Sequence, residues 1–164
     1  MRNVWSFLFL ICSFFSLQSQ SKLDKILKNY NKESVPYIHV SNLIPNDSIV
    51  LLDSREEVEF NVSHIKNAIW VGYDTFNKDS TLNKFTNKNS PIVVYCSIGV
   101  RSENIGETLV KMGYTNVKNL YGGIFEWKNQ DQPVYNLEQQ KTEKVHAYNK
   151  HWGKLLKKGE KIYN

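Results

Sequence analysis

The sequence predicts an α/β fold in which a central parallel sheet carries helices on both faces. From Val35 onward, short apolar segments rich in β-branched residues alternate with segments of helical spacing, and strands separated by helices are typical of parallel sheets. Residues 92–95 (Ile-Val-Val-Tyr) are apolar throughout, as expected for a strand buried on both faces. The 164 residues, of which 41% are hydrophobic and 23% charged, suit one globular domain.

The individual elements follow in order along the chain. Strands are predicted at residues 37–40, 49–52, 68–71, 92–95 and 116–120, and helices at residues 54–60 and 102–112. Gly113 is the stop signal of the second helix. Ligands of open parallel sheets bind beyond the carboxyl ends of the strands, so the residues that follow Tyr95 are in position for chemistry.

The first twenty residues have the order of a secretory signal peptide. Arg2 precedes an apolar run from Val4 to Phe15, and a small polar stretch follows it. The run is shorter than the roughly 20 residues of a membrane span. We therefore expect an exported, periplasmic or secreted protein that is cleaved near Gln20, and an uncleaved membrane anchor is the alternative.

The sequence divides into four parts: the signal peptide at 1–20, an amphipathic lead-in at 21–34, the globular domain at 35–136 and a tail at 137–164. The tail contains seven lysines and three glutamates with apolar residues between them, a spacing that predicts an amphipathic helix with a basic face. Such a helix can simply pack its apolar side on the domain. Alternatively, it contacts an acidic protein or an anionic membrane surface.

Cys96 is the one cysteine outside residues 1–20, and an exported lone thiol calls for an explanation by chemistry or by deep burial. It lies where a strand runs through a short loop into a helix. Backbone N–H groups of such a loop and the helix dipole stabilise negative charge, and with Arg101 they are expected to lower the pKa of the thiol. Gly99 gives the loop its backbone freedom, and Ser102 is suited to cap the helix.

This loop resembles the active loop of the rhodanese family, which runs C-x-x-G-x-R from the cysteine into a helix; Cys96, Gly99 and Arg101 match it. Three further segments are similar to family motifs, in the same order: LLDSREEVEF (51–60), HIKNAI (64–69) and LYGGIFEW (120–127). The four matches together cover roughly residues 35–135. The sequence is thus identified as similar to a single-domain rhodanese with a three-layer α/β fold.

The resemblance implies a thiosulfate sulfurtransferase, which moves a sulfane sulfur from a small anionic donor to cyanide or a thiol. Cys96 would be the nucleophile and would carry the sulfur as a persulfide. The residues implied in substrate binding are Arg101, Ser97, Ile98, Gly99 and Val100. The residues implied in structural support of the loop are Asp53, Arg55 and Ser102. His64 is expected to be structural, because a preformed thiolate needs no general base.

Two other functions compete with this interpretation. Phosphatases and arsenate reductases of the same fold have a C-x5-R loop, one residue longer than the C-x4-R of Cys96 to Arg101, and are disfavoured. A rhodanese-like sensor or docking module without turnover remains open. Ser97 stands where many family members carry a basic residue, which is expected to weaken thiosulfate binding.

The sequence predicts no cofactor, no metal site and no nucleic-acid partner. The histidines outside residues 1–20 have no metal-ligand spacing. A glycine-rich nucleotide loop is also missing from the sequence.

Overall fold

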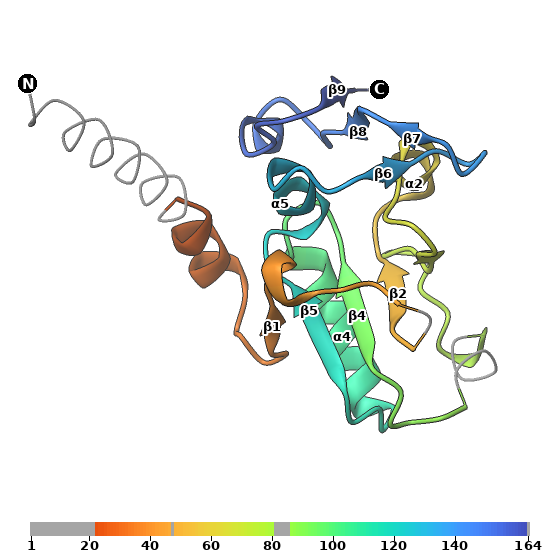
Figure 1. The fold of residues 1–164 in the computed structure, drawn as a ribbon. Helices are drawn as coiled ribbons and strands as arrows, with labels where there is room; N and C mark the ends of the chain where they lie inside the picture. The colour runs from red at the N-terminus through yellow and green to blue at the C-terminus, as the bar shows by residue number, and fades with distance from the viewer. Residues whose placement is uncertain (1–21, 47, 81–85, 164) are drawn as a thin grey trace, which may run out of the picture. The chain divides into compact units, whose positions relative to one another are not determined.

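The computed structural model describes residues 22–46, 48–80 and 86–163 (Figure 1). The chain separates into two units, Met1–Lys32 and Glu33–Asn164. In the first unit, residues 22–30 form a helix. The signal peptide expected at 1–20 lies outside the described residues, and within the described ranges no helix is long and apolar enough to cross a membrane.

A five-stranded parallel sheet forms the centre of the second unit, which confirms the predicted α/β fold class. Its strands, in the order β1-β5-β4-β2-β3, are β1 (Tyr37–Ile38), β2 (Val50–Asp53), β3 (Ile69–Trp70), β4 (Ile92–Tyr95) and β5 (Val117–Leu120). The strand predicted at 37–40 is shorter, because Val40 begins a 3-10 helix, η1 (Val40–Asn42).

Helices α2 (Glu57–Val62), α4 (Val100–Lys111) and α5 (Gly123–Asn129) accompany the sheet, and residues 78–80 are also helical. Helix α4 packs against β4 and β5 and lies behind them in Figure 1. A core cluster lies among these elements: Val35, Leu52, Ile92, Val94, Ile105, Leu109, Tyr114 and Val117.

Helix α2 begins at Glu57, three residues later than the predicted start at Ser54. The backbone N–H groups of the preceding residues are already bound elsewhere: that of Ser54 donates to Tyr95 O at 2.9 Å, and that of Arg55 donates to Asp53 Oδ1 at 3.0 Å. A capping box between Glu56 and the N3 residue Glu59 then starts the helix.

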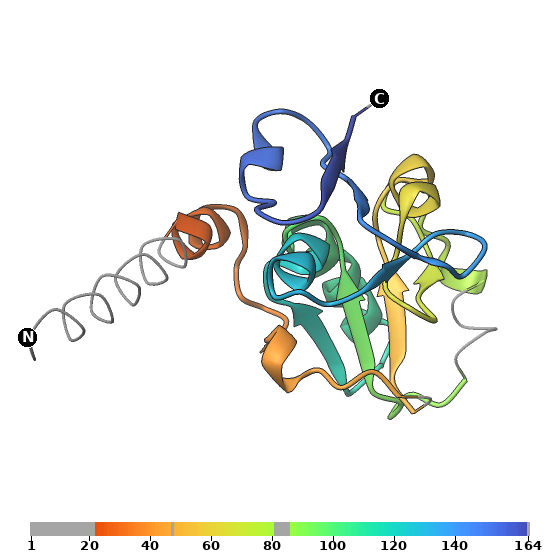
Figure 2. The ribbon, with the colours of Figure 1, turned by 45° about the horizontal axis from the view of Figure 1, so that its top comes forward.

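The C-terminal tail is not the predicted amphipathic helix. Strand β7 (Lys141–Thr142) pairs antiparallel with β6 (Val134–Tyr135), and β8 (Lys144–His146) pairs parallel with β9 (Glu160–Ile162), with the short 3-10 helix η2 (Trp152–Lys154) between β8 and β9 (Figure 2). The helical prediction was wrong for two reasons. Val145 and Ala147 are both fully buried at the two-residue spacing of extended backbone, and Gly159 has a left-handed φ of +87°.

Candidate active site

Cys96 follows the last residue of β4 directly, at the carboxyl edge of the sheet. Its Sγ accepts a hydrogen bond from the backbone N–H of Gly99 at 3.1 Å and lies 3.6 Å from Ser102 Oγ. The side chain is only 1% exposed. Gly99 precedes α4 with a φ of +106°, a conformation that a residue with a side chain rarely adopts. The backbone at Gly99 thus turns its N–H toward the sulfur.

The environment of Cys96 favours the thiolate. Burial acts to raise the pKa of the thiol, but the charge of Arg101 and hydrogen bonds from Ser102 and Gly99 act in the opposite direction. The net result is a pKa below the ordinary value of a cysteine. Because the thiolate is the nucleophilic form of cysteine, this environment favours a reactive Cys96.

Asn119 in β5 fastens the loop to the sheet. Its side chain accepts a hydrogen bond from Ser102 Oγ at 2.7 Å and donates one to Gly99 O at 2.8 Å. All three residues are buried. Sequence analysis missed this residue. The available signal was a polar amide inside a strand whose other inward positions, Val117 and Leu120, are apolar.

The N-terminus of α5 holds the loop from the other side. The carbonyl of Cys96 accepts the N–H of Ile124 at 2.9 Å, and the carbonyl of Ser97 accepts the N–H of Phe125 at 3.1 Å. A Cβ at Gly123 would lie 2.2 Å from Cys96 O and 2.8 Å from Ser97 O. No residue larger than glycine therefore fits at this position against the loop.

Arg101 forms a two-pronged ion pair with Glu59 of α2. Its Nη1 is 2.7 Å from Glu59 Oε2 and its Nη2 is 2.9 Å from Oε1, while Ser97 Oγ donates to the same carboxylate at 2.9 Å. Glu59 is 1% exposed and Arg101 17% exposed. Burial acts to raise the pKa of Glu59, but the hydrogen bond and charge of Arg101 outweigh it, so this pKa is lowered.

The sequence did not indicate Glu59 as a site residue, although Glu59 neutralises the predicted site residue Arg101. Glu56 also approaches Arg101, with Oε1 3.6 Å from Nη1. The structure therefore brings together Cys96, Ser97 and Arg101 as predicted, and it gives the guanidinium a carboxylate partner inside the protein.

Tyr148, in the C-terminal tail, covers the guanidinium of Arg101. Its ring centroid is 5.0 Å from Arg101 Cζ, a distance suited to a cation–π contact. Tyr148 has a φ of +63°, and the N–H of Asn149 bonds across it to Ala147 O at 2.8 Å, which forms a γ-turn. A non-glycine residue held in this conformation is strained, and such strain clusters at functional sites.

The other predicted residues lie around this centre. Arg55 and Asp53 form a fully buried ion pair at 2.6 Å, and Arg55 Nη2 also donates to Ser63 O at the end of α2, the helix that carries Glu59. Ile98 is buried in the loop, and Val100 is the first residue of α4.

His64 has the surroundings of a structural histidine. Its ring stacks on Phe60 with centroids 4.2 Å apart, and its Nδ1 is 3.3 Å from Phe60 O. Its pKa is lowered, chiefly by burial. Within residues 22–46, 48–80 and 86–163, no group of three or more His, Cys, Asp or Glu side chains is arranged to hold a metal ion.

Comparison with known proteins identifies the family. The sequence model of the Rhodanese-like domain matches residues 39–130, more than half of the chain. The chain belongs to the rhodanese-like family. The segment 131–164, which contains Tyr148, lies beyond the matched region.

Relatives of this rhodanese-like chain include sulfurtransferases and larger proteins. It is 27% identical over 96 residues to a thiosulfate sulfurtransferase GlpE of Coxiella burnetii, an alignment that covers 58% of this chain and 87% of that protein. It is 35% identical over 85 residues to the GlpE of Haemophilus influenzae, covering 52% and 78%. A tRNA uridine(34) hydroxylase of Photorhabdus laumondii is 33% identical over 91 residues, which are 54% of this chain but only 26% of that enzyme.

Solved structures share the rhodanese-like fold. The BH2092 protein of Bacillus halodurans has a TM-score of 0.55 at 22% identity, covering 69% of this chain and 85% of that one. A thiosulfate sulfurtransferase of Pseudomonas aeruginosa has a TM-score of 0.58 at 17% identity, covering 84% of this chain and 26% of the other. These similarities support the fold, while the sequence relatives support sulfur transfer as the chemistry of the family.

Proposed function

We propose that this protein is a thiosulfate-type sulfurtransferase that carries a sulfane sulfur on Cys96 and delivers it to cyanide or a thiol. The observation that carries the proposal is the environment of Cys96 Sγ. The sulfur accepts the Gly99 N–H at 3.1 Å, and the thiol has a lowered pKa although it is buried. A cysteine that serves only in packing has no need of this stabilised charge.

In the first half-reaction, the Cys96 thiolate attacks the outer sulfur of the donor. A new S–S bond forms to Cys96, and the S–S bond of thiosulfate breaks, with its electron pair leaving on sulfite. No oxidant or reductant enters. The product is a Cys96 persulfide, whose terminal sulfur carries the negative charge that the thiolate brought.

The backbone amides of the loop from Ser97 to Arg101 are suited to hold that charge. They lie at the start of α4, where N–H groups without a helical partner and the helix dipole favour an anion. In the second half-reaction, cyanide or a thiolate attacks the terminal sulfur and the electron pair of the S–S bond returns to Cys96. Two displacements through a covalent intermediate predict ping-pong kinetics.

Arg101 contributes through its charge rather than as a free anion-binding fork. Both of its terminal nitrogens face Glu59, at 2.7 and 2.9 Å. Its positive charge still favours the Cys96 thiolate. The bound donor is therefore expected to depend mainly on the loop amides, and a weak affinity for thiosulfate is consistent with the serine at position 97.

The test is mass spectrometry of the peptide that contains Cys96, before and after incubation with thiosulfate. We expect a gain of one sulfur, about 32 Da, which cyanide removes as thiocyanate. Cys96→Ser should lose the gain and the turnover and keep the folded structure. If no sulfane donor loads the wild-type protein, the sensor or docking-module interpretation replaces the enzyme.

We also propose that the protein acts after export from the cytoplasm. The proposal rests on the charged, apolar and small polar order of residues 1–20. N-terminal sequencing of the protein from its own cells should find a start near residue 21. An intact Met1 on protein from the cytoplasmic fraction would contradict export.

A further inference from the structure

We propose that residues 137–164, here called the basic segment, form the docking surface for an acidic protein that exchanges sulfur with Cys96. This inference rests on the proposed sulfur transfer and adds to it the partner that supplies or receives the sulfur. Four observations carry it: the distribution of charge, the defined backbone positions of the lysines, the small number of ion pairs that they form within the domain, and the contact of the segment with the active loop.

The net charge of the sequence beyond residue 21 is concentrated in the basic segment. Residues 22–136 contain thirteen basic and thirteen acidic residues and are formally neutral. The basic segment contains seven lysines against three glutamates, a formal charge of +4 before the carboxyl terminus is counted. A surface with one sign of charge steers oppositely charged partners toward itself.

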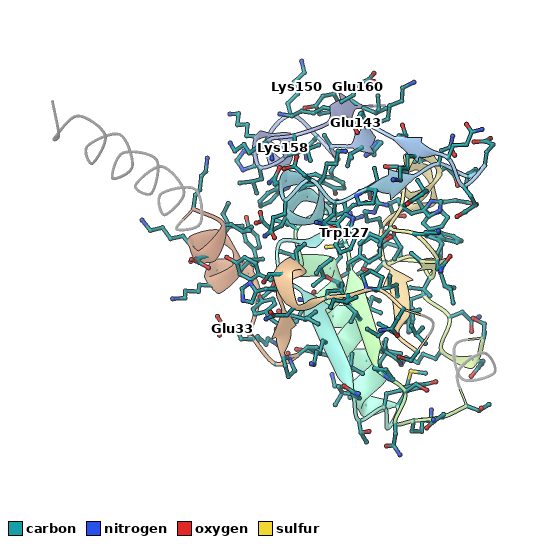
Figure 3. All side chains as sticks on the ribbon, in the orientation of Figure 1. Glu33, Trp127, Glu143, Lys150, Lys158 and Glu160 are labelled. Carbon is teal, nitrogen blue, oxygen red and sulfur yellow. The ribbon has the colours of Figure 1, made fainter. Side chains whose placement is uncertain are left out.

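The structure fixes the backbone positions of the lysines, because the basic segment is folded onto the domain. Strands β8 and β9 pair in parallel, and the segment is tied to α5 through Asn129, whose Nδ2 donates to Leu155 O at 2.9 Å and whose Oδ1 accepts the N–H of Lys157 at 2.6 Å. Figure 3 shows Lys150 and Lys158 at the end of the domain where β9 lies, together with Glu143 and Glu160. The lysines therefore start from defined backbone positions on one folded segment.

All seven lysines of the basic segment are exposed: Lys141, Lys144, Lys150, Lys154, Lys157, Lys158 and Lys161. Among the described residues, Lys158 is the member of this group that forms an ion pair, with Asp131. Glu143, a glutamate of the basic segment, forms an ion pair with Lys128 of α5 and not with a lysine of the segment. The charges of the other six lysines are not neutralised by an ion pair among the described residues, so they can attract an acidic partner.

The basic segment reaches the active loop through Tyr148. This residue is 47% exposed and packs over Arg101, five positions after the nucleophile. Tyrosine is also enriched in the energetically important centres of protein interfaces. A protein that docks on the lysines would therefore lie beside the Cys96 loop.

The chemistry of the site favours a protein over a membrane surface as the occupant. Cys96 is 1% exposed, so an acceptor must present its thiol on a chain that projects toward the loop. Arg101 is neutralised by Glu59, so the attraction for an acidic partner has to come from lysines outside the site. A lipid bilayer offers charge but no thiol to take the sulfur.

The experiment measures sulfur transfer from the Cys96 persulfide of the full chain to two short synthetic peptides. Each peptide has one cysteine; one contains several glutamates, and the other has glutamine at those positions. We expect the acidic peptide to react about tenfold faster at low salt, with the preference shrinking as the ionic strength rises. The triple variant Lys150→Glu, Lys154→Glu, Lys161→Glu should lose the preference and keep its rate with cyanide.

The matched control changes the same charge elsewhere, with Lys78→Glu, Lys111→Glu and Lys118→Glu, and should keep the preference. An equal preference in both triple variants would overturn the docking proposal, as would wild-type protein that binds vesicles containing phosphatidylserine but does not distinguish the peptides. Fluorescence anisotropy with labelled peptides gives the same comparison if no persulfide forms. If the wild-type protein does not transfer sulfur to cyanide, this result would instead contradict the sulfurtransferase proposal.

Discussion

Replacing Glu59 by glutamine removes the charge that Arg101 faces and keeps the size of the side chain. In the wild-type protein, the carboxylate accepts two hydrogen bonds from Arg101 and one from Ser97 Oγ, and its Oε2 also accepts the backbone N–H of Glu56 at 3.1 Å. Glutamine keeps one acceptor oxygen and turns an N–H₂ group toward these donors. The guanidinium then lies partly buried without its anion.

The expected loss of stability is about 3 kcal/mol. Removing one partner of a fully buried ion pair costs about 3–5 kcal/mol. Arg101 is 17% exposed, so water partly compensates its charge, and the lower end of that range applies. For a domain of this size, about 3 kcal/mol corresponds to a fall in Tm of roughly 9 °C.

The pH dependence distinguishes the ion pair from simple packing. The pKa of Glu59 is lowered in the folded state, so its stabilisation is complete above the unfolded value of about 4.3 and is lost as the pH falls through the folded value. Glu59→Gln lacks this titration. Urea denaturation of both proteins from pH 7 downward should therefore show a free-energy difference that is largest at pH 7 and shrinks below about pH 4.

Glu57→Gln is the matched control, because Glu57 lies on the same helix and is exposed. We expect it to change the free energy of unfolding by less than about 0.5 kcal/mol. If Glu59→Gln unfolds at the same urea concentration as this control, or if its deficit does not change with pH, the reasoning is refuted. The substitution also leaves the charge of Arg101 uncompensated near Cys96, so we expect KM for thiosulfate to fall while stability falls.

Three further predictions concern the loop. Gly123→Ala should destabilise the protein by about 3 kcal/mol and abolish sulfur loading, because the new Cβ meets the Cys96 carbonyl. The control Gly113→Ala, at a φ of +91° with open space around the residue, should cost only about 1 kcal/mol. Equal urea midpoints for the two variants would contradict this prediction. Asn119→Ala leaves the buried Gly99 carbonyl unpaired and should cost about 2 kcal/mol in urea denaturation, against no change if the amide is dispensable. The rate at which iodoacetamide alkylates Cys96, followed by mass spectrometry of its peptide, should rise with pH to a midpoint below about 8.5, and Arg101→Ala should raise that midpoint. A wild-type midpoint at or above about 8.5 would show that the thiol is not activated.

Local patterns along the sequence predicted the central elements closely. The strand Ile92–Tyr95 has the predicted bounds, and α4 begins at Val100, two residues before the predicted start. The position of Cys96 at the carboxyl edge of the sheet follows from these two elements alone. Hydrophobic periodicity and a glycine-containing loop are local features, so one sequence is enough to recognise them.

Contacts between distant residues could not be predicted in this way. Glu59 and Arg101 are 42 positions apart, and nothing in the sequence shows which of the glutamates at 56, 57 and 59 contacts the guanidinium. The tail failed for the same reason. Its apolar spacing fits a helix locally, but Val145 pairs with Lys161 across a long connection, and this pairing decides the structure.

Helix α5 holds the loop through the backbone carbonyls of Cys96 and Ser97. In a peptide plane, the C=O and the N–H point in opposite directions. Because α5 binds the carbonyls of Cys96 and Ser97 from one side, the N–H groups of the next residues are turned to the other. The loop cannot widen without breaking these bonds, so its width is set by the scaffold and does not depend on a bound donor.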